Sequence, residues 1–169
     1  MPLTALLAMT VVVTASNWLV QFPINDLLTW GAITYPVSFL ITDLTTRLQG
    51  PERARRVVWA GFALAVALSI WLATPRIALA SGTAFLVGQL LDIQVFQRLR
   101  GGSWWRAPLV SSSLGSVVDT ALFFTLAFAG TDLPWVTLAL GDLSVKLLLA
   151  VLALAPFRAV LTLALPART

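Results

Sequence analysis

The sequence contains no cysteine and no histidine, and only 11% of its 169 residues are charged. These absences exclude disulfide bonds, thiolate nucleophiles, imidazole bases and the commonest zinc ligands, so any proton chemistry must fall to carboxylates. The charged fraction is about half that of an ordinary soluble domain, whereas 59% of the residues are hydrophobic. We therefore expect an integral membrane protein.

The net charge of +4 does not indicate a nucleic-acid partner. The eleven basic residues are spread among apolar runs and form no continuous basic stripe. The sequence also lacks a Gly-x-Ser-x-Gly elbow, a His-Glu-x-x-His motif and a paired Asp-x-x-Asp metal motif. We expect no enzyme activity, no metal site and no cofactor.

Six apolar segments are separated by turns that contain proline or glycine. A membrane-spanning helix needs roughly 20 residues, and each segment comes close to this length. The predicted helices cover residues 3–22, 28–46, 57–74, 77–97, 108–130 and 134–157. We predict one all-α domain over residues 1–169, with six transmembrane helices and the first segment retained as a span.

The distribution of basic residues predicts the orientation, because short cytoplasmic loops retain Lys and Arg during insertion. With six spans, Arg76 lies alone on one side and Lys146 lies inside the last helix. The other nine share the opposite side: Arg47, Arg53, Arg55, Arg56, Arg98, Arg100, Arg106, Arg158 and Arg168. Both termini are therefore predicted to be cytoplasmic, whereas five or seven spans would break this alternation.

Polar side chains inside the predicted spans require a partner or a task, because lipid makes buried charge costly. Spacings of three or four residues place them in pairs on one helical face. The pairs are Asn17 with Gln21, Asp43 with Arg47, Gln89 with Asp92, and Asp142 with Lys146. Polar faces on several helices predict a shared hydrated cavity. The alternative is a set of internal ion pairs that hold the helices in register. For Asp43 and Arg47 both interpretations stay open, as a gate or as a structural ion pair.

Asp119 lies near the centre of the fifth predicted helix and has no cation within one turn of its own helix. It therefore needs Lys146 from the next helix, a proton or a ligand. Ser112, Ser116 and Thr120 accompany it in a small polar stripe. Close packing of helices through small residues would use the same stripe.

Pro36 lies well inside the second predicted helix, close to Gly31 and Thr34. A proline at such a position either interrupts the helix, which frees backbone carbonyls for protein, water or substrate, or only kinks it. If the chain consists of two three-helix halves, this helix corresponds to the fifth. Because three is odd, the halves would form a 3+3 inverted repeat, an arrangement that many transporters use.

Several strings are similar to those of a known family. They are Ser16 to Gln21, Thr29 to Ala32, the Thr-Asp-Leu-Thr-x-Arg string at 42–47, the Gly-Gln-x-x-Asp string at 88–92, Trp104-Trp105 and Asp119-Thr120. Over nearly its whole length the chain resembles the queuosine-precursor transporter family, also called the vitamin uptake transporter family. The resemblance implies a six-helix carrier of the bacterial inner membrane for 7-cyano-7-deazaguanine or its aminomethyl relative, precursors of a modified tRNA base.

Such a substrate suits the polar residues of the spans. A deazaguanine presents N–H and amino donors along one edge, which a carboxylate such as Asp119 or Asp92 accepts in a paired fashion. Amide side chains read its carbonyl and ring nitrogens, and Tyr35 offers a ring for stacking. The predicted substrate-binding residues are Asn17, Gln21, Tyr35, Gln89, Asp92, Ser116, Asp119, Asp142 and Lys146.

Other functions remain open at this point. The chain has no nucleotide-binding loop, so a substrate-binding subunit of a vitamin importer would need separate ATPase partners. A structural or assembly factor is a further alternative. Energy coupling is either uncoupled equilibration or proton symport through Asp119 or Asp142. Expected partners are a small deazapurine and membrane lipid, and the small-residue patterns Gly61-xxx-Ala65 and Ala63-xxx-Ala67 would allow a homodimer or contacts within one chain.

Overall fold

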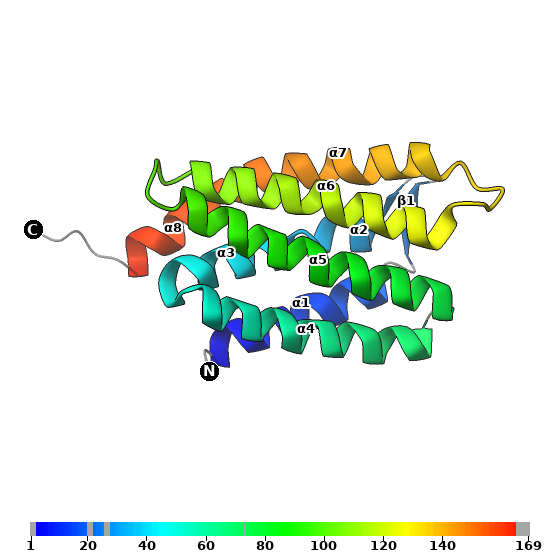
Figure 1. Ribbon diagram of the computed structural model, residues 1–169, viewed down its shortest axis with the longest axis horizontal. Coiled ribbons are helices and arrows are strands. Elements are labelled where there is room, and N and C mark those ends of the chain that lie inside the picture. The colour runs from blue at the N-terminus through cyan, green and yellow to red at the C-terminus, as the bar shows by residue number, and fades with distance from the viewer. Residues whose placement is uncertain (1–2, 20–21, 26–27, 73, 165–169) are drawn as a thin grey trace, which may run out of the picture.

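The helices of the computed structural model run side by side along the long axis of a bundle (Figure 1). The structure describes residues 3–19, 22–25, 28–72 and 74–164. The helices are α1 (Leu3–Leu19), α2 (Trp30–Thr34), α3 (Val37–Gln49), α4 (Pro51–Leu72), α5 (Pro75–Leu99), α6 (Arg106–Phe128), α7 (Trp135–Leu152) and α8 (Leu154–Ala164). Two short antiparallel strands, β1 (Pro23–Asn25) and β2 (Leu28–Thr29), form a hairpin between α1 and α2.

Within the described residues, three helical segments are long and apolar enough to cross a membrane: Pro75–Leu99, Arg106–Phe128 and Trp135–Ala164. A fourth apolar segment, Leu3–Ser16, is shorter. The chain is therefore a helical membrane protein, whereas the number of six spans stays a prediction.

The predicted helix at 28–46 is wrong as a continuous element. Residues 28–29 form β2, α2 ends at Thr34, and α3 begins at Val37. Pro36 has no N–H, so it cannot continue the helical hydrogen bonds. The chain turns instead through hydrogen bonds between residues three apart rather than four. These run from Ser38 N to Tyr35 O at 2.9 Å and from Phe39 N to Pro36 O at 3.1 Å. Pro36 thus interrupts the helix rather than kinking it.

Other helix ends follow local capping signals more closely than hydropathy. The helix predicted at 57–74 begins at Pro51, because Gly50 turns the chain with a φ of 91° and proline suits the first helical position. The helix predicted at 77–97 begins at Pro75, where the Thr74 side chain accepts a hydrogen bond from Ile77 N. The segment predicted at 134–157 is divided at Ala153 into α7 and α8.

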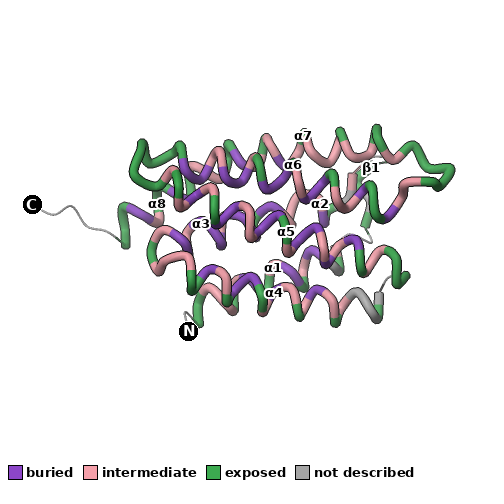
Figure 2. The backbone as a smooth tube through the Cα atoms, viewed as in Figure 1, coloured by how far each residue is buried: buried purple, intermediate pink, exposed green. Residues whose placement is uncertain are grey.

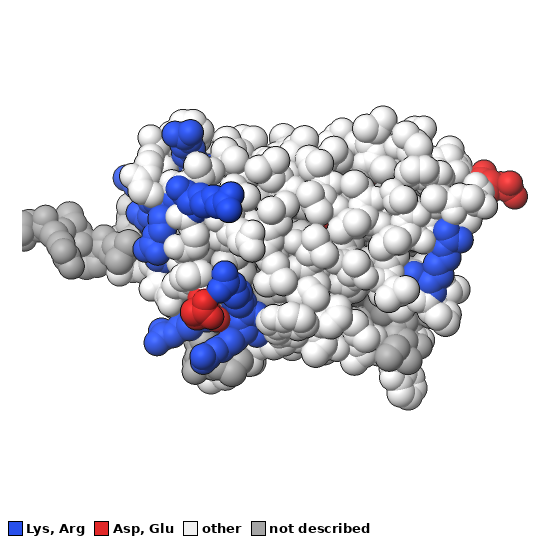
Figure 3. All heavy atoms as spheres, in the orientation of Figure 1, with Lys and Arg blue, Asp and Glu red and all other residues white. Residues whose placement is uncertain are grey.

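The basic residues gather at one end of the bundle. In Figure 1, α1 begins and α8 ends at the same end, which also carries the α3–α4 and α5–α6 connections. Figure 3 shows most of the blue side chains at that end. This arrangement agrees with the charge distribution from which the orientation was predicted. We call this the basic end, and the end with the β1–β2 hairpin the hairpin end.

The core lies between α5 and the helices around it, and Figure 2 shows the buried stretches of α3, α5 and α6 facing inward. One apolar cluster joins α1, α3, α4 and α5 through Met9, Val13, Ile41, Val57, Val58, Ala65, Phe85 and Ile93. A second cluster at the basic end joins α8 to α5 and α6 through Phe96, Ala107, Phe157 and Leu161. Between these clusters the interior of the bundle is polar.

Helices α5 and α6 touch through two glycines. A Cβ atom at Gly88 would lie 3.0 Å from Asp119 Cβ and 3.1 Å from the carbonyl oxygen of Gly115. A Cβ atom at Gly115 would lie 2.7 Å from a Phe39 ring carbon and 3.0 Å from the Gly88 carbonyl oxygen. Larger residues would force the helices apart, so the glycines set their close approach. Asp92 and Asp119 each follow one of these glycines by four residues, on opposite sides of the contact because the helices are antiparallel.

The pattern Gly61-xxx-Ala65 on α4 is used inside the chain. A Cβ atom at Gly61 would lie 2.9 Å from Met9 and 3.2 Å from Phe85, and Ala65 is buried in the first apolar cluster. Ala63 and Ala67 are exposed. A homodimer through the exposed pair stays a prediction.

Candidate functional site

Five side chains form a polar group in the middle of the bundle, which we call the charged cluster: Asp119, Thr120 and Lys146, which are buried, and Tyr35 and Asp142, which are partly buried. Its centre is Lys146 Nζ, which lies 2.8 Å from Asp119 Oδ2, 2.5 Å from Asp142 Oδ2 and 3.0 Å from Thr120 Oγ1. The Tyr35 hydroxyl donates to Asp119 Oδ1 at 2.9 Å, and the Thr120 hydroxyl donates to Asp142 Oδ2 at 2.8 Å. Lys146 Nζ also lies 5.3 Å from the centroid of the Tyr35 ring, within cation–π range.

The cluster draws its members from three parts of the fold. Asp119 and Thr120 are consecutive residues on α6, while Asp142 and Lys146 lie one turn apart on α7. Tyr35 lies in the break between α2 and α3. Of the three partners expected for Asp119, the structure supplies Lys146, and the pair predicted between Asp142 and Lys146 is also formed. Charges remain in a membrane interior only with such partners.

A second polar group lies closer to the basic end, and we call its two acids, Asp43 of α3 and Asp92 of α5, the carboxyl pair. Asp43 Oδ1 accepts a hydrogen bond from the Ser111 hydroxyl at 3.0 Å, and Asp43 Oδ2 accepts one from Ser112 at 2.8 Å. The Asp92 side chain lies beside this group, because a Cβ atom at Gly115, one turn after the two serines on α6, would lie 3.4 Å from Asp92 Cβ; its carboxyl group is close enough to that of Asp43 for the two to interact. Neither Asp92 oxygen has a hydrogen-bond partner, although the residue is 0% exposed.

The ion pair predicted between Asp43 and Arg47 is not formed. The Arg47 guanidinium donates instead to the Arg100 carbonyl oxygen at 2.9 Å, at the end of α5. Asp43 points the other way, into the bundle, where the serines of α6 replace the expected cation. A spacing of four permits an ion pair, but here each side chain finds a partner on another helix. A gating role for these residues stays a prediction.

Gln89 is held by α3 rather than by the charged cluster. Its amide oxygen accepts a hydrogen bond from Thr42 Oγ1 at 2.5 Å, and its amide nitrogen donates to Ser38 Oγ at 2.9 Å. Gln89 is 0% exposed. It is one turn from Asp92 on α5, as predicted, but its polar atoms are already satisfied by the two hydroxyls.

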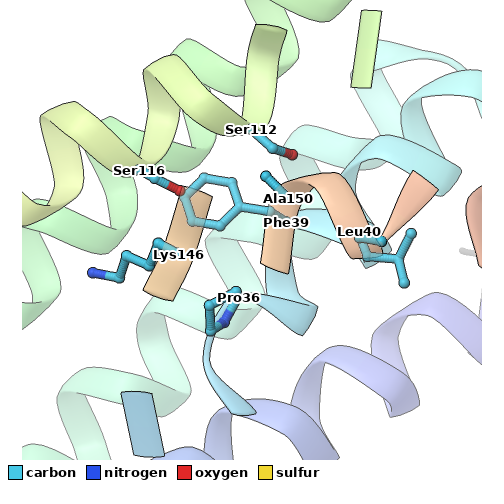
Figure 4. Close-up of a pocket in the computed structure, with 8 residues that line it drawn as sticks. Pro36, Phe39, Leu40, Ser112, Ser116, Lys146 and Ala150 are labelled. Carbon is cyan, nitrogen blue, oxygen red and sulfur yellow. The ribbon is translucent and has the colours of Figure 1, made fainter. Parts of the chain in front are cut away.

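A small cavity of about 10 Å³ lies between the two polar groups. Its lining includes Ser112, which hydrogen-bonds the carboxyl pair, Ser116, and Lys146 of the charged cluster. Figure 4 shows the Phe39 ring projecting towards Ser116 in this space, with Pro36 at its side. A cavity of this size holds about one water molecule.

A wider and more open cavity of about 350 Å³ lies where α1 meets the hairpin and α2. Its lining is apolar and aromatic: Trp18, Leu19, Phe22 and Trp30. It is a shallow depression at the surface rather than an enclosed pocket, because Trp18, Phe22 and Trp30 are each at least 43% exposed. Its rings offer faces for stacking. Within the described residues, no group of three or more acidic side chains is arranged to hold a metal ion.

The predicted site residues are thus divided between two places. Tyr35, Asp119, Asp142 and Lys146 meet in the charged cluster, Asp92 lies in the carboxyl pair, and Ser116 lines the cavity between them. The side chains of Asn17 and Gln21 lie outside the described residues. The predicted site residues did not include Ser38, Thr42 or Ser111. The spacing of four between Ser38 and Thr42, which places both on one face of α3, could have indicated the first two.

Comparison with known proteins identifies the family. A family model described as "Putative vitamin uptake transporter" matches residues 29–74 and 68–161, which contain both polar groups. The chain belongs to this vitamin uptake transporter family. The resemblance drawn from the sequence is confirmed.

Curated relatives of this chain carry more specific names. It is 37% identical to "Queuosine precursor transporter" of Escherichia coli (strain K12), over 89% of this chain and 81% of the relative. It is 33% identical to "Probable queuosine precursor transporter" of Haemophilus influenzae, over 86% and 79% of the two chains. A probable queuosine precursor transporter of Bacillus subtilis (strain 168) is 28% identical over 60% of this chain. No solved structure matches the chain.

Proposed function

We propose that this vitamin uptake transporter imports a queuosine precursor, 7-cyano-7-deazaguanine or its aminomethyl relative, across the bacterial inner membrane. In this proposal the chain crosses the membrane six times with both termini in the cytoplasm. The names of the E. coli and H. influenzae relatives support the substrate class. The observation that carries the proposal is the buried Asp119 carboxylate, each of whose oxygens accepts one hydrogen bond from a separate side chain.

The Asp119 carboxylate suits the donor edge of a deazaguanine. Tyr35 and Lys146 donate to its two oxygens at 2.9 Å and 2.8 Å. The ring N–H and the exocyclic amino group of the substrate present the same pattern of two neighbouring donors. The substrate therefore replaces Tyr35 and Lys146 on Asp119 without leaving either oxygen unsatisfied.

Lys146 can release Asp119 without becoming an unpaired buried charge. It keeps Asp142, one turn away on its own helix, and Thr120 of α6 as partners. A buried ammonium with no partner would cost several kcal/mol, and this second set of contacts avoids that cost. Once released, the ring of Tyr35 lies next to Asp119 and can stack on the substrate.

Binding requires the helices to part. The cavity beside Lys146 has a volume of about 10 Å³, whereas pockets for drug-sized ligands measure roughly 300–1,000 Å³. The break at Tyr35 and Pro36 is the natural hinge, because α2 can rotate there without losing regular helical hydrogen bonds. The aromatic cavity formed by Trp18, Phe22 and Trp30 lies towards the hairpin end and offers a first contact for a planar ring.

Uptake in cells tests the proposal. A bacterial strain that lacks its own carrier and cannot synthesise the precursors is given either deazaguanine, and the queuosine content of its tRNA is measured. Expression of this chain is expected to restore the modified base. The variant Asp119→Asn removes the carboxylate and is expected to abolish restoration, whereas Asp132→Asn, the same chemical change in an exposed loop, is expected to leave it intact.

A wild-type chain that inserts at normal levels without restoring the modified base would overturn the substrate assignment. Uptake by the purified chain alone in liposomes separates a carrier from a binding subunit with ATPase partners. We expect the chain to equilibrate the precursor without any added ATPase. A requirement for one would favour the importer subunit.

A further inference from the structure

We propose that the carboxyl pair of Asp43 and Asp92 binds a proton, carried by Asp92, and that this proton drives transport. The coupling role rests on the proposed function, whereas proton binding itself does not. The site is separate from the charged cluster where the substrate is expected, and it lies closer to the basic end.

The hydrogen bonds divide the two acids into an ionised and a protonated partner. Both oxygens of Asp43 accept hydrogen bonds from serine hydroxyls, at 3.0 Å and 2.8 Å. This environment stabilises the negative charge of Asp43. Asp92 has no such donors, because both of its oxygens lack hydrogen-bond partners although the residue is fully buried.

The contact between the two carboxyl groups itself calls for a proton. The carboxyl groups of Asp92 and Asp43 are close enough to interact, and two ionised carboxylates have only acceptor atoms. A proton on Asp92 turns this repulsive contact into an O–H to O⁻ hydrogen bond and satisfies the unpartnered side chain. It also removes one of two buried negative charges that would otherwise repel each other at close range. Two adjacent acids that share one proton are a known way of relieving such repulsion.

No cation of the surrounding helices takes the place of the proton. The ion pairs found among the described residues are Glu52 with Arg55, and Lys146 with Asp119 and Asp142. On α3, Arg47 turns to the Arg100 carbonyl. The remaining charged groups of the packed helices are exposed: Arg53 and Arg56 of α4, Arg98 of α5, Arg106 of α6 and Arg158 of α8 lie near the basic end. Arg76 of α5 lies at the other end, where it donates to the carbonyl oxygens of Leu126 and Ala129.

The position of the pair links it to the substrate site. Ser112 donates to Asp43 and lines the same water-sized cavity as Lys146, which binds Asp119. Asp92 and Asp119 also flank the glycine contact between α5 and α6. A movement of these helices that opens the charged cluster to substrate therefore also changes the surroundings of Asp92. In the transport step, Asp92 takes its proton from water at the outer side and later releases it to water at the cytoplasmic side; it then becomes a carboxylate, while Asp43 stays ionised.

Transport in liposomes tests the coupling. The purified chain is reconstituted and supplied with labelled 7-cyano-7-deazaguanine, which is uncharged, with the membrane potential held at zero. An acidic outer solution is expected to drive accumulation inside, up to about tenfold for each unit of pH difference if one proton accompanies each substrate. Asp92→Asn is expected to lose accumulation but to keep exchange of labelled for unlabelled substrate, and Asp92→Glu is expected to retain accumulation.

The control variant is Asp132→Asn, which should accumulate substrate like the wild type. Uptake that reaches only equal concentrations regardless of the pH gradient overturns the coupling. Accumulation driven by a Na⁺ gradient at equal pH also overturns it. Absence of both uptake and exchange in the wild type defeats the proposed function and the coupling role together.

Infrared spectroscopy tests proton binding without transport. The purified wild-type chain at neutral pH is expected to show the C=O stretch of a buried carboxylic acid, which Asp92→Asn removes and Asp132→Asn does not. The absence of this band from the wild type overturns the proposal even if transport is normal. This measurement uses the wild-type protein and therefore does not depend on the folding of a variant.

Discussion

The hydroxyl of Tyr35 and the carboxylate of Asp119 are joined by a 2.9 Å hydrogen bond between residues 84 positions apart. Tyr35 lies where the chain breaks between α2 and α3, and Asp119 lies in the middle of α6. This hydrogen bond therefore holds the interrupted segment against α6, and it joins the two members of the charged cluster that are farthest apart in sequence among its hydrogen bonds. Substrate that takes the place of Tyr35 on Asp119 would free this segment.

Tyr35→Phe removes the hydroxyl and keeps the ring. Asp119 then retains Lys146 but loses its second donor, and a hydrogen bond to a charged group contributes about 1.5–3 kcal/mol. We expect the free energy of unfolding to fall by about this amount, visible as a lower midpoint of thermal unfolding in detergent. Unchanged stability would mean that this hydrogen bond contributes nothing in the folded protein.

Lys146→Met leaves Asp119 and Asp142 buried beside each other without their shared cation. Breaking a buried ion pair from one side costs about 3–5 kcal/mol. We therefore expect the single variant to unfold more readily than the triple variant Lys146→Met, Asp119→Asn, Asp142→Asn, which removes all three charges. Thermal unfolding of the purified variants compares them, and a triple variant less stable than the single one would contradict the cluster geometry.

Gly115→Ala places a Cβ atom 2.7 Å from the Phe39 ring and 3.0 Å from the Gly88 carbonyl oxygen. Overpacking of this kind costs about 1–3 kcal/mol. The matched control is Gly141→Ala on α7, where nothing lies within 4 Å of the added atom. Alanine there is expected to stabilise the helix by about 0.5–1 kcal/mol. Equal effects of the two substitutions on the unfolding midpoint would argue against the close contact of α5 and α6.

The orientation can be measured cleanly because the chain has no native cysteine. Ser103→Cys lies in the α5–α6 connection at the basic end, and Asp132→Cys lies in the α6–α7 connection at the hairpin end. Both positions are exposed. A thiol reagent that cannot cross membranes, added to spheroplasts, is expected to label Asp132→Cys and to leave Ser103→Cys unlabelled until the membrane is opened. The reverse pattern would place the termini outside the cytoplasm.

Two contacts of the charged cluster could be predicted from the sequence. Asp142 and Lys146 share a helical face, so their spacing alone indicated the ion pair that is formed. Lys146 was also one of the three partners expected for Asp119, besides a proton and a ligand, because the next helix offers a cation inside a span. The interruption at Pro36 was recognised as one of two outcomes, but local sequence cannot decide between a break and a kink.

The remaining contacts depend on how the helices cross. Asp43 turns to Ser111 and Ser112 rather than to Arg47, and this choice is made by the packing of α3 against α6. That packing follows from the close approach at Gly88 and Gly115, which hydropathy does not reveal. For the same reason Asp92 and Asp119, expected as alternatives at one pocket, lie in two separate polar groups.

The glycine contact between α5 and α6 also has a mechanical consequence. Asp92 and Asp119 are part of this contact: a Cβ atom at Gly115 would lie 3.4 Å from Asp92 Cβ, and one at Gly88 would lie 3.0 Å from Asp119 Cβ. A displacement of either helix at this point would therefore move both acids together.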